Sequence, residues 1–323
     1  MPKKNSPEND EAGAKGAAPE HEEVAQATRC GFVALIGAPN VGKSTLVNAL
    51  VGSKVTIVSP KVQTTRALVR GIAMEGASQV VLVDTPGIFA PKRRLDRAMV
   101  TTAWAGAHDA DLVCVLIDAK RGFDDETSAM LAKLKDVSHR KILVLNKVDT
   151  VEKPKLLKLA EQANAQYKFD DTFMVSATKG DGVGDLRKYL GQAVSAGPWL
   201  YPEDQIADAP AQSLSTEITR EKLFHKLHQE LPYQLTVEVE QWKELRGGAL
   251  RIEQTIYVER ESQRKIVLGD GGEMIKSIGS SARKELQELL ERPVHLFLFV
   301  KVREGWGDDP ERYREMGLEF PKG

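Results

Sequence analysis

Short apolar runs separated by charged, periodic stretches fill the first two-thirds of the chain. From Phe32 onward the runs read FVALIG, QVVLVD, LVCVLID, KILVLN and FMVSA. Continuous apolar runs of this length are typical of strands buried on both faces of a sheet, and the stretches between them predict helices. Strands that alternate with helices predict a doubly wound, mainly parallel α/β domain over residues 29–197.

The pattern changes after a proline-containing stretch at residues 198–212, PWLYPEDQIADAPAQ, which predicts a linker. Beyond it the order is a helix, two strands with period-2 alternation, a glycine-broken turn, a long helix and a last strand. This order predicts a separate α+β domain over residues 213–323.

Composition narrows the class of protein. The 323 residues include 45 Lys and Arg against 46 Asp and Glu, so any site for a polyanion has to be local. Two cysteines form neither a disulfide framework nor a zinc pattern, which favours a reducing, cytoplasmic location. With no apolar run of bilayer length and no signal peptide, we expect a soluble protein. Residues 1–28 contain few large apolar side chains and are predicted to be disordered.

A glycine-rich loop lies between the first predicted strand and the first predicted helix. Backbone N–H groups of such a loop, together with the helix N-terminus, bind phosphates. Lys43 can reach the outer phosphates, and Ser44 is placed to ligate Mg²⁺. At this point any P-loop ATPase is an alternative. The predicted phosphate site comprises Gly37, Ala38, Pro39, Asn40, Val41, Gly42, Lys43, Ser44 and Thr45.

Asp84-Thr85-Pro86-Gly87 ends the apolar run QVVLV and therefore stands beside the glycine-rich loop. Asp84 can hold Mg²⁺ through water, and the N–H of Gly87 can turn towards a γ-phosphate. An Asp before a Pro-Gly pair is by itself an ordinary turn. Its position behind the glycine-rich loop favours a role in catalysis.

Two further strand ends predict a base site. Asn146-Lys147-Val148-Asp149 follows KILVL, and Ser176-Ala177 ends FMVSA, at the edge where ligands of doubly wound folds bind. Asp149 can accept from both N1–H and the exocyclic amine of guanine, donors that adenine lacks. Asn146 would support the loop, the stem of Lys147 would cover the ring, and a backbone N–H at Ser176-Ala177 would face the guanine oxygen. NKVD alone is more typical of a surface turn, but as the third motif in this ordered set it favours GTP over ATP.

The ordered series GAPNVGKS, QTTR, DTPG, NKVD and SA resembles translation-factor-type GTPases, and among them the Era family of ribosome-assembly GTPases. The resemblance implies that a threonine of QTTR completes the Mg²⁺ shell only when GTP is bound, and the family pattern favours Thr65 over Thr64. It also implies that Asn40 coordinates K⁺. Ile88 stands where many GTPases carry a water-orienting glutamine, so hydrolysis is expected to be slow and to depend on Mg²⁺, Lys43 and backbone groups.

The second domain contains a GxxG turn between two helical segments. The order helix, strand, strand, GxxG, helix, strand resembles a type II KH domain, whose GxxG loop allows close approach of an RNA backbone. Asp270 departs from the neutral or basic residue that phosphate favours, and the nearby positive charges are also common on a solvated helix face. The residues predicted to bind RNA are Arg264, Lys265, Gly269, Asp270, Gly271, Gly272, Lys276 and Arg283.

With REKL, LPY and RPVHL added, the resemblance to the Era family covers residues 30–317. It implies binding to the 3′ end of small-subunit ribosomal RNA, a role in assembly of the small ribosomal subunit, and peripheral contact with the inner face of the cell membrane; we expect a monomer. The leading hypothesis is a GTP-hydrolysing switch. The alternatives are a constitutive RNA-binding scaffold with structural nucleotide and an ATP-driven RNA remodeller.

Overall fold

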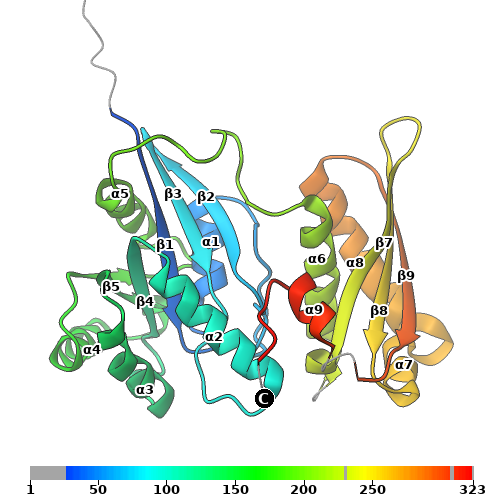
Figure 1. Cartoon of the computed structure of the whole chain (residues 1–323), viewed down its shortest axis with the longest axis horizontal. Coiled ribbons are helices and arrows are strands. Elements are labelled where there is room, and N and C mark those ends of the chain that lie inside the picture. The colour runs from blue at the N-terminus through cyan, green and yellow to red at the C-terminus, as the bar shows by residue number, and fades with distance from the viewer. Residues whose placement is uncertain (1–26, 229–230, 306–308, 322–323) are drawn as a thin grey trace, which may run out of the picture.

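Two domains lie side by side in the computed structural model, which describes residues 27–228, 231–305 and 309–321 (Figure 1). The predicted disordered tail falls outside these ranges except for its last two residues. Within the described ranges, no helix combines the length and the apolar character needed to cross a membrane.

The first domain is built on a six-stranded sheet in the order β2-β3-β1-β4-β5-β6. Every neighbouring pair is parallel except β2 and β3. The prediction of a doubly wound, mainly parallel sheet is confirmed. The strands are β1 (Arg29–Gly37), β2 (Val69–Glu75), β3 (Ser78–Asp84), β4 (Leu112–Asp118), β5 (Arg140–Asn146) and β6 (Asp171–Val175).

Helices cover both faces of this sheet because its central strands are apolar on both sides. One face packs against α1 and α5, the other against α2, α3 and α4. Strands β3 and β4 are buried along their whole length, as their continuous apolar runs predict. The helices are α1 (Lys43–Val51), α2 (Arg94–His108), α3 (Asp125–Lys133), α4 (Lys153–Gln166) and α5 (Val183–Ala193), with 3₁₀ turns at Leu134–Asp136 and Val148–Thr150.

The apolar runs did not mark β2, which is the antiparallel edge strand. Its sequence, VRGIAME, carries buried side chains only in the middle, and charged residues near both ends face solvent. An edge strand needs less apolar surface than a central one, so its pattern is weaker.

The second domain has a three-stranded sheet in the order β7-β8-β9, with β7 and β8 antiparallel and β8 and β9 parallel. Helices α6 and α8 pack on one face through the apolar side chains of both core clusters. The predicted α+β type II KH domain is thereby confirmed. Its elements are α6 (Ala211–Lys226), a 3₁₀ turn (Leu231–Gln234), β7 (Leu235–Glu244), β8 (Leu250–Val258), α7 (Glu261–Leu268), a 3₁₀ turn (Asp270–Gly272), α8 (Glu273–Leu290) and β9 (Val294–Val302).

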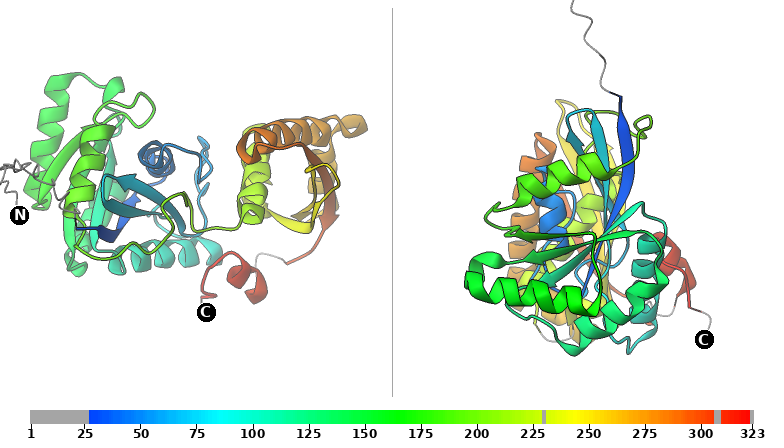
Figure 2. Two further views of the ribbon diagram at one scale, coloured as in Figure 1. Left: turned by 90° about the horizontal axis from the view of Figure 1, so that it is seen from above. Right: turned by 90° about the vertical axis from the view of Figure 1, so that its left-hand side faces the viewer.

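Helix α6 starts directly after Pro210, within the stretch 198–212 that the sequence predicted as linker. It faces the first domain, as the view from above shows (Figure 2). This placement brings the segment between α1 and β2 against the second domain.

A short helix that the sequence did not predict, α9 (Pro310–Glu315), lies between the domains beside α2 (Figures 1 and 2). Tyr313 and Leu318 of this C-terminal segment (residues 310–320) are buried in one cluster with Met99 of α2. The ring of Phe320 lies 4.9 Å from that of Tyr313, and the guanidinium of Arg94 lies 4.9 Å from the Phe320 ring centre. The C-terminal segment is therefore packed on a helix of the first domain.

Candidate functional site

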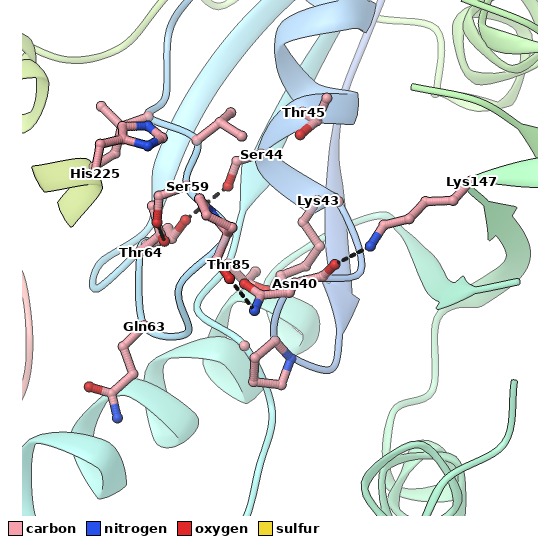
Figure 3. Close-up of a pocket in the computed structure, with 17 residues that line it drawn as sticks. Asn40, Lys43, Ser44, Thr45, Ser59, Gln63, Thr64, Thr85, Lys147 and His225 are labelled. Atoms are coloured by element: carbon pink, nitrogen blue, oxygen red, sulfur yellow. Dashed lines mark hydrogen bonds between the residues drawn. The ribbon is translucent and has the colours of Figure 1, made fainter. Parts of the chain in front are cut away.

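The carboxyl ends of β1, β3 and β5 meet at one edge of the first sheet, because parallel strands end on the same side. A cavity of about 380 Å³ opens there, lined mainly by the glycine-rich loop and by residues 57–65 (Figure 3). His225, from α6 of the second domain, also lines it. Among the described residues, no cluster of three His, Cys, Asp or Glu side chains is arranged to hold a metal.

The glycine-rich loop wraps tightly between β1 and α1. Gly42 precedes α1 with φ of 97°, and a Cβ there would lie 2.3 Å from Nδ2 of Asn146. Gly87 is also tightly packed, because a Cβ there would lie 2.9 Å from Cγ of Pro39. Both glycines allow contacts that any side chain would prevent.

Lys43 is buried at the start of α1, and its ammonium donates to the carbonyl oxygens of Gly37 and Ala38, each at 3.1 Å. Burial lowers the pKa of Lys43 to about 8, an effect that the charge of Asp84 partly offsets. A phosphate would give this cation a charged partner in place of two neutral carbonyls.

Three hydroxyl groups converge on one carboxylate oxygen at the end of β3. Ser44 Oγ lies 2.7 Å, Thr56 Oγ1 2.9 Å and Thr65 Oγ1 3.2 Å from Oδ2 of Asp84. Asp84 is fully buried, and burial raises its pKa above the ordinary value. Its other oxygen, Oδ1, is buried without a hydrogen-bond partner within the described part of the chain. Hydroxyl and carboxylate oxygens of this kind fit Mg²⁺.

The two threonines of QTTR face different ways. Thr65 Oγ1 lies 2.9 Å from Ser44 Oγ, beside Asp84. Thr64 Oγ1 instead contacts Ser59 Oγ at 2.6 Å and donates to the carbonyl of Lys61. The geometry places Thr65, the family-favoured residue, at the carboxylate.

Sequence reasoning missed two polar residues of this edge. Thr56 precedes QTTR without a motif of its own, so only the fold reveals its bond to Asp84. Asp118 ends β4 as Asp84 ends β3, a parallel that could have pointed to it. Its Oδ2 lies 2.6 Å from Nζ of Lys147, which also donates to the carbonyl of Asn40 at 2.7 Å.

Asn146 joins the loops of the predicted base site. Its Nδ2 donates to the carbonyl of Val41 at 2.9 Å, and its Oδ1 accepts from the backbone N–H groups of Lys147 and Ala177 at 2.8 and 3.1 Å. The N–H of Ala177, expected to face the guanine oxygen, is thus bonded to Asn146 here. Ser176 is buried at the end of β6, and Asp149 is exposed after β5.

Ile88 does not enter the cavity. Its side chain is buried in the core cluster with α2, α3 and α4, and its N–H donates to the carbonyl of Gly37 at 3.0 Å. The position after DTPG therefore supports the loop and offers no polar group to a water. Thr85 lines the cavity, while its hydroxyl donates to the carbonyl of Leu35 at 2.7 Å.

Asn40 connects the glycine-rich loop to the segment before QTTR. It has a left-handed backbone with φ of 62°, and its Nδ2 donates to the carbonyl of Pro60 at 2.9 Å. The side-chain amide predicted to bind K⁺ thus lies against a second loop that also carries carbonyl oxygens.

The backbone of the GxxG turn in the second domain is accessible at two of its glycines. A Cβ on Gly271 would meet nothing within 4 Å, and one on Gly272 only a methyl group of Ile275 at 4.0 Å. Gly269 differs, because a Cβ there would lie 2.6 Å from that of Met274. Asp270 lies exposed in the turn.

Three of the predicted RNA-binding cations, Lys265, Lys276 and Arg283, are exposed on α7 and α8. The side chain of Arg264 instead contacts other residues of the second domain. It pairs with Glu261 at 2.7 Å and donates to the carbonyl of Val300 at 3.2 Å. Its predicted contact with RNA would require both bonds to be replaced.

Comparison with known protein families identifies both domains. A 50S ribosome-binding GTPase family matches residues 32–147, and a KH domain family matches residues 230–307. GTPase Era of Afipia carboxidovorans is 70% identical over 301 residues, which cover 93% of this chain and 98% of that protein.

Two solved structures are also similar over 90% of this chain and 99% of their own, each with a TM-score of 0.85 and 36% identity. One is a variant of Aquifex aeolicus Era bound to GDP and AlF4⁻. The other is Era in complex with MgGDPNP and nucleotides 1506–1542 of 16S ribosomal RNA.

We predict that Asp149→Asn weakens GTP binding at least about tenfold, because the amide presents a donor where guanine also presents donors. Affinity for xanthine nucleotide should rise, since its oxygen can accept from that amide. Calorimetric titration with each nucleotide measures both changes in affinity. Asp125→Asn, an equally exposed substitution on α3, should leave both affinities unchanged. An unaltered GTP affinity in Asp149→Asn would refute the base site.

The two threonines of QTTR should differ in hydrolysis. Thr65→Ala removes a hydroxyl beside Asp84, so we expect single-turnover GTP hydrolysis to fall about tenfold or more and to require more Mg²⁺. Thr64→Ala should lower the rate much less, because Thr64 contacts Ser59 and Lys61 instead. Rapid-quench assays over a Mg²⁺ series compare them, and the reverse order of effects would reject the assignment.

Proposed function

The chain belongs to the Era family of GTPases, and from this premise we propose that it couples GTP hydrolysis to binding of the 3′ end of small-subunit ribosomal RNA. Such coupling would serve assembly of the small ribosomal subunit. The observation that carries the enzymatic half is the buried Asp84 carboxylate, on which hydroxyls from α1 and from the QTTR segment converge.

In this proposal GTP or GDP binds with Mg²⁺ at the carboxyl edge of the first sheet. Lys43 binds the outer phosphates, Ser44 and Thr65 ligate Mg²⁺, and Asp84 holds it through water. Gly87 donates its N–H to the γ-phosphate. The metal would neutralise charge that develops on the phosphoryl oxygens, and the loops would exclude water from the phosphates.

Binding of RNA is supported by the open GxxG turn and by the relative that was solved with 16S ribosomal RNA. The GTPase family that matches residues 32–147 is named for binding to the large (50S) ribosomal subunit, whereas the Era complex contains RNA of the small subunit. We propose small-subunit RNA as the ligand, because the similarity to the protein in that complex includes the KH domain as well. The cytoplasmic location, the monomeric state and peripheral membrane contact stay predictions.

The RNA-binding surface is tested by the double variant Gly271→Asp, Gly272→Asp. Both glycines have room for a side chain, and aspartate tolerates their left-handed backbone better than most residues, so the fold should persist. We expect affinity for a single-stranded fragment of the ribosomal 3′ end to fall about tenfold or more, because the new charges repel phosphates.

The matched control is Gly247→Asp, Gly248→Asp, in the turn between β7 and β8. These glycines also have positive φ and open surroundings, but they lie outside the GxxG turn. RNA titrations at fixed salt, with nucleotide titrations alongside, compare the variants. Equal losses in both would indicate non-specific repulsion, and no loss in the GxxG variant would place the RNA elsewhere.

We further propose that K⁺ bound between Asn40 and the Pro60 segment supplies the positive charge that an arginine finger provides in other GTPases. Carbonyl and amide oxygens are suitable ligands for this ion. Hydrolysis should then be faster in K⁺ than in Na⁺, and Asn40→Ala should abolish the difference. Steady-state rates in the two chlorides at equal ionic strength measure it. Equal rates in the wild-type protein would contradict the proposal.

A further inference from the structure

The segment that carries Thr65 is held by the second domain on both sides of this residue. On the N-terminal side, Nη2 of Arg220 in α6 donates to the carbonyl of Thr64. On the C-terminal side, Nη1 of Arg66 donates to the carbonyl of Leu235 at 2.9 Å, and Nη2 to that of Pro232 at 3.3 Å. Thr65 is therefore bracketed by two interdomain contacts.

Arg220 is itself held rigidly on α6. Its Nε donates to Glu217 at 2.8 Å, Nη2 contacts the same carboxylate, and the guanidinium lies 5.2 Å from the centre of the Phe224 ring. Only 3% of Arg220 is exposed. A planar guanidinium fixed in this way presents Nη2 in a defined direction, towards the Thr64 carbonyl.

This arrangement is a poor source of stability. Two guanidinium groups, those of Arg220 and Arg66, are buried near each other, and Glu217 is the carboxylate that acts on both. Nη1 of Arg220 is buried without a hydrogen-bond partner in the described part of the chain. Burial and the charge of Arg220 lower the pKa of Arg66 to about 9. Buried charges cost desolvation energy, so a buried ion pair is weak evidence for a stabilising role, and in some proteins such groups instead specify one arrangement.

We propose that Arg220 is a positioning residue for GTP hydrolysis, acting through the Thr64 carbonyl to hold the Thr65 hydroxyl at the Asp84 carboxylate. The inference rests on the proposed function of Thr65. It makes the KH domain a physical part of the nucleotide switch, because the peptide between Thr64 and Thr65 is fixed from α6. Arg66 supports the same residue from its other side.

The test uses the full chain with Arg220→Met, which keeps the packing stem and removes the donors. Glu217 is partly exposed, so water can solvate the carboxylate that is left. The expected loss in single-turnover hydrolysis is about tenfold, with a higher Mg²⁺ requirement, since small misplacements of reacting groups are costly. GDP affinity should stay within about twofold, because Thr65 is expected to ligate Mg²⁺ only when the γ-phosphate is present.

Lys54→Ala is the matched control. Lys54 pairs across the same interface with Glu221 at 2.7 Å and also with Glu285, but it does not touch the Thr64 carbonyl. Its loss should loosen domain contact and leave the hydrolysis rate within about twofold. Equal losses in Lys54→Ala and Arg220→Met would overturn the proposal, since general domain contact would then explain both.

A double-mutant cycle separates this inference from the function it rests on. If Arg220 acts through Thr65, Arg220→Met should cost nothing further in a Thr65→Ala background. Additive losses would overturn the inference, as would a wild-type rate in Arg220→Met. A wild-type rate in Thr65→Ala would instead reject the proposed role of Thr65. If Arg220→Met does not fold, Arg66→Met tests the interdomain contact on the other side of Thr65. It should give the same loss of hydrolysis and the same lack of further loss in the Thr65→Ala background.

Discussion

The structure depends on one buried carboxylate, Asp84, whose Oδ2 accepts three hydrogen bonds and whose Oδ1 accepts none from the described residues. Asp84 ends a fully buried strand, and one of its oxygens accepts hydrogen bonds from hydroxyl groups of α1 and of the segment before β2. A buried carboxylate is costly unless it is hydrogen-bonded or paired with a cation, so these hydroxyls and a metal satisfy the same need. The loop between α1 and β2 is thereby held at the site through Thr56 and Thr65.

The same loop is also held by the second domain, at residues that alternate with those at the site. Lys61 donates to the last carbonyls of α6, and Arg66 donates to carbonyls before and at the start of β7. A loop held from two sides cannot change at the nucleotide without changing at the domain contact. Coupling between two binding sites requires an element that both sites contact, and this loop lines the nucleotide cavity and also contacts the second domain.

The sequence predicted what local pattern encodes. Apolar runs located the central strands, and the spacing of DTPG and NKVD behind the glycine-rich loop located the site, because parallel strands bring their ends together. The roles of Asp149 and Lys43 could be predicted from these motifs without the three-dimensional structure. Pattern could not predict β2, whose apolar stretch is short, or Thr56, which belongs to no motif. It also could not predict that Arg220, inside the recognised REKL segment, reaches Thr64, since contacts between residues 156 positions apart follow from domain packing.

The C-terminal segment has a consequence for biosynthesis. Tyr313 and Leu318 cover apolar residues of α2, a helix that follows directly on the DTPG loop. Chains are synthesised from the N-terminus, and domains fold in that order. The first domain therefore emerges from the ribosome and folds while the residues that cover α2 are still untranslated. Until residues 313–318 are translated, this cover is missing from Ala98 and Met99, so a chain truncated before Tyr313 would carry an uncovered apolar patch on α2.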